Sequence, residues 1–353
     1  MNGTLHDVTW RGFASDNYAG GHPDVLQAMV DANGGHQVAY GEDVFTSRLR
    51  DVIKDLFGSQ ADVFPVFNGT GANVVALQSM LQRWEAVVCA TSAHVQADEG
   101  GAPERTGGFK LHLVDTEDGK LTPELIDRQA WGFGDQHRAQ PAVVTITNST
   151  ELGTVYSAAE VAAVSEHAHA KGMRVHMDGA RLSNAAAALG CDFRTFTTDA
   201  GVDVLSMGGT KIGAVGAEAI VVLNPSAVSG MEFLRKGAMQ LSSKMRFVSA
   251  QMLALFDGDL WKRNALHANA MAARLAEGVR DIPGLQISRK VDANAVFAVL
   301  PADVTARLQQ RFRFYTWNEV TGEVRWMASW DTEEADIDAF VAAVKAEMAS
   351  VSQ

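Results

Sequence analysis

Short apolar runs separated by amphipathic stretches occupy most of this chain, and the most informative pair lies near its middle. Residues 175–177 and 202–207 are apolar runs typical of buried strands, and the Ala-rich segment 180–189 between them is typical of a helix. A strand, a helix and a second strand over this length predict a right-handed βαβ unit with parallel strands. Both strands should therefore end on the same edge of a sheet, where open α/β sheets bind ligands.

The same patterns predict the rest of an α/β domain. Further buried strands are expected at 63–67, 86–90, 110–114, 142–147 and 219–223. Amphipathic helices are expected to begin at Pro23 and near Val44, and others at 74–81, 123–131 and 157–171, the last of which opens on an S-x-x-E capping box, Ser157 to Glu160. This alternation of strands and helices is typical of a sheet covered by helices.

The last third of the chain has a different pattern. Residues 231–278 are helical in character with a break near Gly258, and helices are also expected at about 302–311 and 332–349. Short β runs lie at 285–288, 295–300, 314–317 and 323–327, so this region predicts a small α+β domain. Because 353 residues is long for one hydrophobic core, we expect an N-terminal arm (1–22), a large domain (23–258) and a small C-terminal domain (259–353).

Composition narrows the classes of partner. The formal net charge is −12, with no cluster of lysine or arginine, which argues against a nucleic-acid or anionic membrane surface. No apolar run approaches the roughly 20 residues that a membrane span needs. Cys89 and Cys191 are the only cysteines and lie in apolar contexts, so neither a disulfide framework nor a metal site is expected. The expected compartment is the cytoplasm, and the expected partner is a small molecule.

Two charged residues give the central βαβ unit a candidate chemistry. Asp178 closes the first apolar run, and Lys211 follows the second, so both are expected at the ligand-binding edge. A lysine and a carboxylate held together suit pyridoxal 5′-phosphate (PLP), because its aldehyde forms a Schiff base with an amine and its pyridine nitrogen needs a carboxylate to stay protonated. On these two residues alone, an ordinary ion pair at the strand ends is an equally good interpretation.

Two other stretches are compatible with the same site. The sequence NGTGAN, residues 68–73, joins a predicted strand to a predicted helix, and glycines with unpaired helix N-terminal amides can hold a phosphate. The alternative is a plain helix entry capped by Asn or Thr. His94 and Glu99 lie in a Gly- and Pro-rich loop after a strand, a usual place for site residues, although a lone loop histidine is more often simply solvated.

Taken together, these features resemble the low-specificity L-threonine aldolases, PLP enzymes of the aspartate-aminotransferase-like fold (fold type I). The motifs SDN, AYGED, NGTGAN, AHV followed by EGG, TELG, HMDGAR and GGTK occur in the order and spacing of that family, from about Phe13 to Asp331. The resemblance implies a large PLP-binding domain with a mixed, mostly parallel sheet and a small α+β C-terminal domain. It also implies a homodimer or homotetramer with shared active sites.

The resemblance also implies roles for individual residues. Lys211 would form the Schiff base, and Asp178 would pair with the pyridine nitrogen. Gly69 and Thr70 would hold the phosphate, and His94 would stack on the cofactor ring. The remaining positions match contacts to cofactor or substrate: Ser15, Arg181 and Arg325 for the substrate carboxylate, Arg181 also on the cofactor side, and Tyr40 and Arg246 reaching the site of a neighbouring subunit.

The implied reaction is retro-aldol cleavage of an L-β-hydroxy-α-amino acid, such as L-threonine, L-allo-threonine or phenylserine, to glycine and an aldehyde. His94 is the first candidate for the base that takes the β-hydroxyl proton, with Glu151 or Glu99 as the alternative. Glu151 stands where the commoner form of the family has a histidine, which resembles the branch that includes phenylserine aldolases. Asn17 and the Gly-Gly-Thr before Lys211 also depart from the common form. The alternative reactions are β-elimination by a tryptophanase-like lyase and cofactor binding without catalysis.

Overall fold

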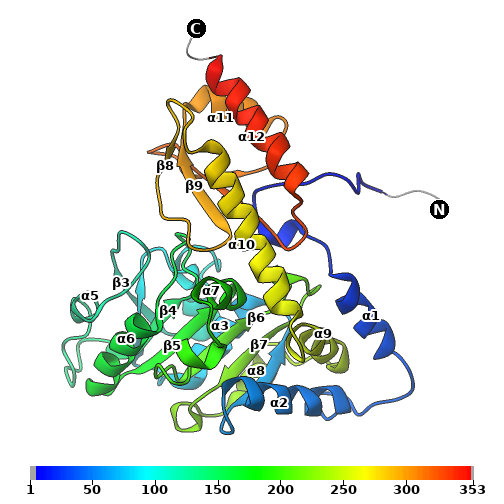
Figure 1. The fold of residues 1–353 in the computed structure, drawn as a ribbon. Helices are drawn as coiled ribbons and strands as arrows, with labels where there is room; N and C mark the ends of the chain where they lie inside the picture. The colour runs from blue at the N-terminus through cyan, green and yellow to red at the C-terminus, as the bar shows by residue number, and fades with distance from the viewer. Residues whose placement is uncertain (1–4, 351–353) are drawn as a thin grey trace.

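The computed structural model describes residues 5–350 and contains two hydrophobic cores. The larger core holds the strands of a seven-stranded sheet with the helices around it, and the smaller core holds residues of the C-terminal region together with Phe13 from the N-terminal arm. Helix α10 (Leu260–Val279) contributes to both cores and connects the two regions in Figure 1. No described helix is both long and apolar enough to cross a membrane.

The large sheet has the strand order β1-β7-β6-β5-β4-β2-β3. Only β7 runs antiparallel to its neighbours, so the sheet is mixed and mostly parallel, as the resemblance implied. In sheet order the strands are Asp62–Val66 (β1), Glu218–Val222 (β7), Val204–Gly208 (β6), Arg174–Gly179 (β5), Gln140–Thr147 (β4), Glu85–Ala90 (β2) and Lys110–Val114 (β3).

The central βαβ unit forms as the apolar runs predict. Strands β5 and β6 pair in parallel, with Asp178 opposite Ser206, and helix α7 (Leu182–Leu189) joins them. Gly190, in the left-handed conformation with φ +64°, ends α7, which is a usual role of glycine after a helix. Both strands therefore end on one edge, and Lys211 follows three residues after β6 in a short 3₁₀ turn.

Several helices differ from the sequence-based expectation. Helix α3 begins at Gly69 rather than at residue 74, because Asn68 caps it and its first turn accepts the glycines that a helix interior disfavours. The expected helix at 123–131 ends at Asp127, and the helical region after residue 231 is interrupted at 238–245 as well as near Gly258. The helices of this domain are Pro23–Asp31 (α1), Val44–Phe57 (α2), Gly69–Met80 (α3), His94–Ala97 (α4), Pro123–Asp127 (α5), Ala158–Ala170 (α6), Met231–Gly237 (α8) and Arg246–Phe256 (α9).

The small region is an antiparallel sheet with helices on one side. Its strand order is β10-β11-β9-β8, and its helices lie at the top of Figure 1. The N-terminal arm joins it, since Phe13 donates its N–H to the Arg313 carbonyl and accepts from Met327 N–H. The elements are Gln286–Ile287 (β8), Ala295–Val299 (β9), Ala302–Gln309 (α11), Tyr315–Asn318 (β10), Glu323–Met327 (β11) and Glu334–Ala349 (α12).

Candidate active site

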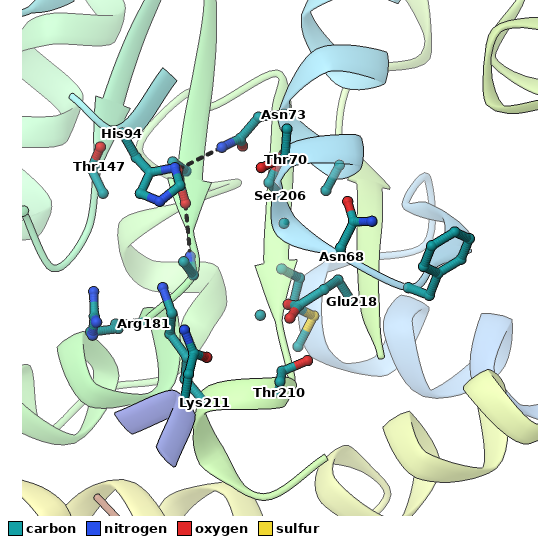
Figure 2. A pocket seen from close by; sticks show the side chains of 18 of the residues that line it. Asn68, Thr70, Asn73, His94, Thr147, Arg181, Ser206, Thr210, Lys211 and Glu218 are labelled. Atoms are coloured by element: carbon teal, nitrogen blue, oxygen red, sulfur yellow. Dashed lines mark hydrogen bonds between the residues drawn. The ribbon is translucent and has the colours of Figure 1, made fainter. Parts of the chain in front are cut away.

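One pocket lies at the edge where the parallel strands end. Four elements of the large sheet region contribute to its wall: the ends of β4, β5 and β6 and the first turns of α3 (Figure 2). Among the residues proposed from the sequence, the pocket is lined by Gly69, Thr70, His94, Glu151, Asp178, Arg181 and Lys211. The expectation that Asp178 and Lys211 share one edge is therefore confirmed.

Asp178 is held as a charged acceptor. Its side chain is 4% exposed, and its two oxygens accept from Asn73 Nδ2 at 2.7 Å and from Ala180 N–H at 2.9 Å. Burial works against the charge, but nearby His94 and these hydrogen bonds outweigh it, so the pKa of Asp178 lies below its usual range. The carboxylate is thus ready to accept a further hydrogen bond from a ring nitrogen.

The surroundings of Lys211 favour the neutral form of its side chain, whereas those of Asp178 favour the charged form. Lys211 is half-buried, and desolvation followed by the positive charge of Arg181 lowers the pKa of its amine. The glycines before it let the chain approach the neighbouring strands closely. A Cβ at Gly208 would lie 2.4 Å from the Ala180 carbonyl oxygen, and one at Gly209 would lie 2.6 Å from the Ala217 carbonyl oxygen. A bulkier lead-in would therefore displace the lysine.

The first turn of α3 faces the same pocket. Asn68 Oδ1 accepts from Gly71 N–H at 2.7 Å, so the cap uses one of the amides that no helical carbonyl can reach. Gly69 and Thr70 precede Gly71 in that turn, and their N–H groups stand at the positive end of the helix dipole. Because α3 begins earlier than expected, these two residues are the helix terminus itself and not a loop before it.

His94 is the first residue of a short helix and not, as expected, a loop residue. Its Nδ1 lies 2.9 Å from Glu99 Oε1, and its main-chain N–H donates to Glu151 Oε1 at 2.8 Å. The hydrogen bond to Glu99 raises the pKa of His94, and burial raises the pKa of the fully enclosed Glu99 carboxyl. His94 Nε2 is the ring nitrogen that Glu99 does not engage.

Glu151 lies just past the end of β4 and reaches the pocket. Its Oε1 also accepts from Thr147 Oγ at 2.8 Å. Burial, followed by the charge of Asp178, raises the pKa of Glu151, which makes its carboxylate a better proton acceptor near neutral pH. The sequence prediction that Glu151 belongs to the site is consistent with this geometry.

Arg181 forms an ion pair that the sequence did not predict. Its Nε and Nη2 donate to the two oxygens of Asp16 at 2.7 and 2.9 Å, and Asp16 is 1% exposed. Burial opposes this charge, but Arg181 and then Lys211 lower the pKa of Asp16 to about 2. Asp16 is the middle residue of the SDN motif, yet no local pattern links it to a partner 165 residues away.

The other proposed residues do not line the pocket in one chain. Ser15 Oγ accepts from Asn17 N–H at 3.2 Å, and its neighbour Asn17 lines the pocket instead. Arg325 Nη2 donates to the Ala14 carbonyl at 3.1 Å. Its guanidinium stacks on Trp317 at 4.5 Å, and burial followed by nearby Arg181 lowers its pKa to about 10.

Tyr40 and Arg246 lie further away. Tyr40 is 51% exposed and adopts a left-handed φ of +63°, and Arg246 Nη1 donates to the Gly35 carbonyl at 3.1 Å. Tyr40 therefore lies on the outer surface of the chain, and Arg246 is half-buried. No group of three His, Cys, Asp or Glu side chains suited to a metal occurs within residues 5–350.

Comparison with known proteins places this fold and pocket in a family. The profile of the beta-eliminating lyases matches residues 12–303, and the chain therefore belongs to that family. A low-specificity L-threonine aldolase of a Pseudomonas species is 44% identical over 96% of this chain and 98% of its own length, and that of Pseudomonas aeruginosa is 46% identical over 91% and 93%. Within the family, the chain belongs to the low-specificity L-threonine aldolases.

Solved structures agree with the fold. A threonine aldolase from Leishmania major has a TM-score of 0.90 and 29% identity, with 95% of this chain and 99% of that chain covered. Mouse CSAD has a TM-score of 0.74 at 16% identity, with 95% of this chain and 83% of that chain covered, which supports the fold alone. The expected two-sheet architecture is therefore confirmed.

Proposed function

We propose that this chain is a PLP-dependent aldolase that cleaves L-β-hydroxy-α-amino acids to glycine and an aldehyde. The observation that carries the proposal is the placement of a charged Asp178, an amine of lowered pKa on Lys211 and the first turn of α3 around one pocket. These groups match the three polar parts of PLP, its ring nitrogen, its aldehyde and its phosphate.

PLP, when bound, supplies an aldehyde for the amine and a ring that accepts the electron pair left when Cα–Cβ breaks. The protein supplies the rest. The lowered pKa of Lys211 favours the neutral, nucleophilic amine, and Asp178 would hold a proton on the ring nitrogen. The N–H groups of Gly69 and Thr70 would bind the phosphate, as helix N-termini commonly do.

The β-hydroxyl proton has two candidate acceptors. His94 has Nε2 free of the Glu99 contact, and Glu151 has a carboxylate whose raised pKa suits proton transfer. Arg181 and Arg325 together carry two positive charges against the single carboxylate of Asp16, which favours binding of a substrate carboxylate between them. Tyr40 and Arg246, which do not line the pocket of their own chain, would reach the site of a neighbouring subunit in a dimer or tetramer.

The experiment is an assay of products. The purified protein with PLP is given L-threonine, L-allo-threonine and phenylserine, and glycine, aldehyde, ammonia and 2-oxo acid are measured. We expect equal amounts of glycine and aldehyde. Release of ammonia and a 2-oxo acid instead would favour β-elimination, which the family profile also includes. The relative rates on the three substrates test whether Glu151 marks a preference for aromatic aldehydes.

A further inference from the structure

Two motif residues have no role in the mechanism above, although both are buried beside the pocket. Asn73 is the last residue of NGTGAN and lies on α3 with 2% of its surface exposed. Glu99 is the first residue of EGG, and its side chain is fully enclosed. Burial of an amide and a carboxylate has a cost unless their hydrogen bonds are satisfied, so these contacts are informative.

Asn73 joins two carboxylates with a single amide group. Its Nδ2 donates one hydrogen to Asp178 Oδ2 at 2.7 Å and the other to Glu99 Oε1 at 2.8 Å. Figure 2 shows this side chain directed towards the His94 side of the pocket, with the bond to Asp178 dashed. Rotating the amide by 180° would place Oδ1 against two carboxylate oxygens, so the observed orientation is the only favourable one.

The same Glu99 oxygen also contacts His94. With Glu99 Oε1 as the acceptor, His94 Nδ1 is the donor, and Nε2 is then the nitrogen without a proton in the neutral ring. One amide thus connects the acceptor for the ring nitrogen with the group that fixes the tautomer of His94. Glu99 Oε2 and Asn73 Oδ1 are buried without a partner among the described residues. The side-chain hydrogen bonds of Asn73 and Glu99 therefore go only to each other, to Asp178 and to His94.

We propose that Asn73 and Glu99 are positioning residues of the active site. By donating to both buried carboxylates, Asn73 stabilises the negative charge of Asp178 beside Glu99. Asp178 therefore stays an acceptor for the cofactor nitrogen. Glu99 holds His94 with Nε2 turned to the reacting atoms. This inference rests on the proposed function, because it assigns the two residues a role in that reaction. The protonation of His94 and the binding of PLP can nevertheless be measured without substrate.

The pKa of His94 is one readout. Glu99, Asp178 and Lys211 are the charged groups that act on its ring, and Glu151 contacts its main-chain N–H. Because the bond to Glu99 is the largest influence and raises the pKa of His94, Glu99→Gln should lower that pKa. The pKa is measured by NMR of the full chain with ring-labelled histidine, and the His94 signal is identified by its loss in His94→Gln.

The affinity for PLP is the second readout. Asn73→Leu keeps the size of the side chain but removes both donors, so the pKa of Asp178 should rise and PLP should bind about tenfold or more weakly. Because the loss of affinity comes from protonation of Asp178, Asn73→Leu should bind PLP most weakly, relative to wild type, at acid pH. The difference in affinity should become smaller as pH rises. A purely structural defect would not follow pH in this way.

Asn184→Leu is the matched control. Asn184 is 1% exposed, and its Nδ2 donates to the amide oxygen of Asn269 at 3.0 Å rather than to a carboxylate. Equal PLP affinities for Asn73→Leu and Asn184→Leu, or an unchanged His94 pKa in Glu99→Gln, would overturn the proposal. If Asn73→Leu does not fold, Asn73→Ser, which retains one donor, replaces it with the same expected pH trend. Failure of the wild type to cleave its substrates would leave the His94 measurement intact, so the two proposals are tested separately.

Discussion

The two sides of the pocket differ in where their residues come from and in how their charges are balanced. The cofactor side, defined by Asp178, Lys211 and the first turn of α3, is built from one sheet edge, and its groups are already hydrogen-bonded or desolvated. The proposed substrate side, defined by Asp16, Arg181 and Arg325, combines the N-terminal arm, the large sheet region and β11, and only its Arg181 lines the pocket. There, Asp16 pairs with the guanidinium of Arg181, whereas the guanidinium of Arg325 makes no hydrogen bond to a carboxylate among the described residues.

This difference separates two tasks of an active site. Side chains at strand ends are held in place by the hydrogen-bonded sheet, so the cofactor side is formed before any ligand binds. The substrate side carries excess positive charge, and Arg325 Nε is buried without a partner among the described residues. An anion bound there would give the Arg325 guanidinium the hydrogen-bond partner that its Nε lacks. Changes on the first side should therefore affect cofactor and turnover together, and changes on the second should affect substrate alone.

The largest expected effect is that of Lys211→Ala. Loss of the amine should abolish turnover and the visible absorption of protein-bound PLP, because no other lysine lines the pocket. Absorption spectra, product assays and borohydride reduction of the PLP complex measure this, with Lys262→Ala at an exposed position as the control. A reducible lysine adduct that persists in Lys211→Ala would move the reactive amine elsewhere.

The next effect concerns the proton acceptor at the border of the two sides. If Glu151 is the base, Glu151→Gln keeps its shape but should lower kcat by about 10²–10⁴-fold. If His94 is the base, His94→Phe should cause that loss and Glu151→Gln should remain within a few-fold of wild type. Binding of glycine, which lacks a β-hydroxyl, is measured in both variants and should be retained.

A smaller effect is expected on the substrate side. Arg325→Ala should raise KM about 10- to 100-fold, the equivalent of losing hydrogen bonds between charged groups, while the spectrum of bound PLP stays the same. Arg311→Ala removes an exposed arginine of the same region and should leave KM unchanged. An unaltered KM in Arg325→Ala would remove this residue from the substrate side.

The smallest effect on activity is expected for a substitution of His176, which lies on β5 two residues before Asp178. This ring is fully buried between Thr145 Oγ at 2.8 Å and Ser206 Oγ at 3.0 Å, and burial lowers its pKa to about 4. An unfolded histidine has a pKa near 6.5, so the unfolded chain takes up a proton first as pH falls. Stability should be complete above pH 6.5 and should decrease towards pH 4, by up to about 3 kcal/mol.

Urea unfolding at pH 7 and pH 4.5 tests this. His176→Gln retains a polar side chain but does not titrate, so its stability should decrease less than that of wild type between the two pH values. Equal decreases would assign the acid sensitivity to other groups. A large loss of kcat at pH 7 would show that His176 also positions the cofactor side, which would narrow the difference between the two sides.

The sequence predicted the cofactor side well for a physical reason. Buried parallel strands are continuous apolar runs, so β5 and β6 were recognisable, and a charge directly after each run must lie at the sheet edge. The start of α3 was missed by five residues, because glycines at 69 and 71 read as a loop when only their helix propensity is considered.

The substrate side was less predictable. Asp16 and Arg181 meet only because the arm crosses to the end of β5, and no periodicity records such a contact. Asn73 and Glu99 each stand in a recognised motif, but the hydrogen bond between them joins α3 to the second residue after α4. Motif spacing identified the neighbourhood, whereas the pairing of donors with acceptors required the fold.

The position of Phe13 has a consequence for how the chain is made. Phe13 is synthesised long before Phe340, yet its ring stacks on Phe340, with centroids 4.6 Å apart, within the smaller core. At typical rates of synthesis, Phe13 waits on the order of tens of seconds for that partner. The large region can complete much of its own core meanwhile, but Phe13 cannot pack into the smaller core until residue 340 has been made. The substrate side is therefore expected to be the last part of the enzyme to mature.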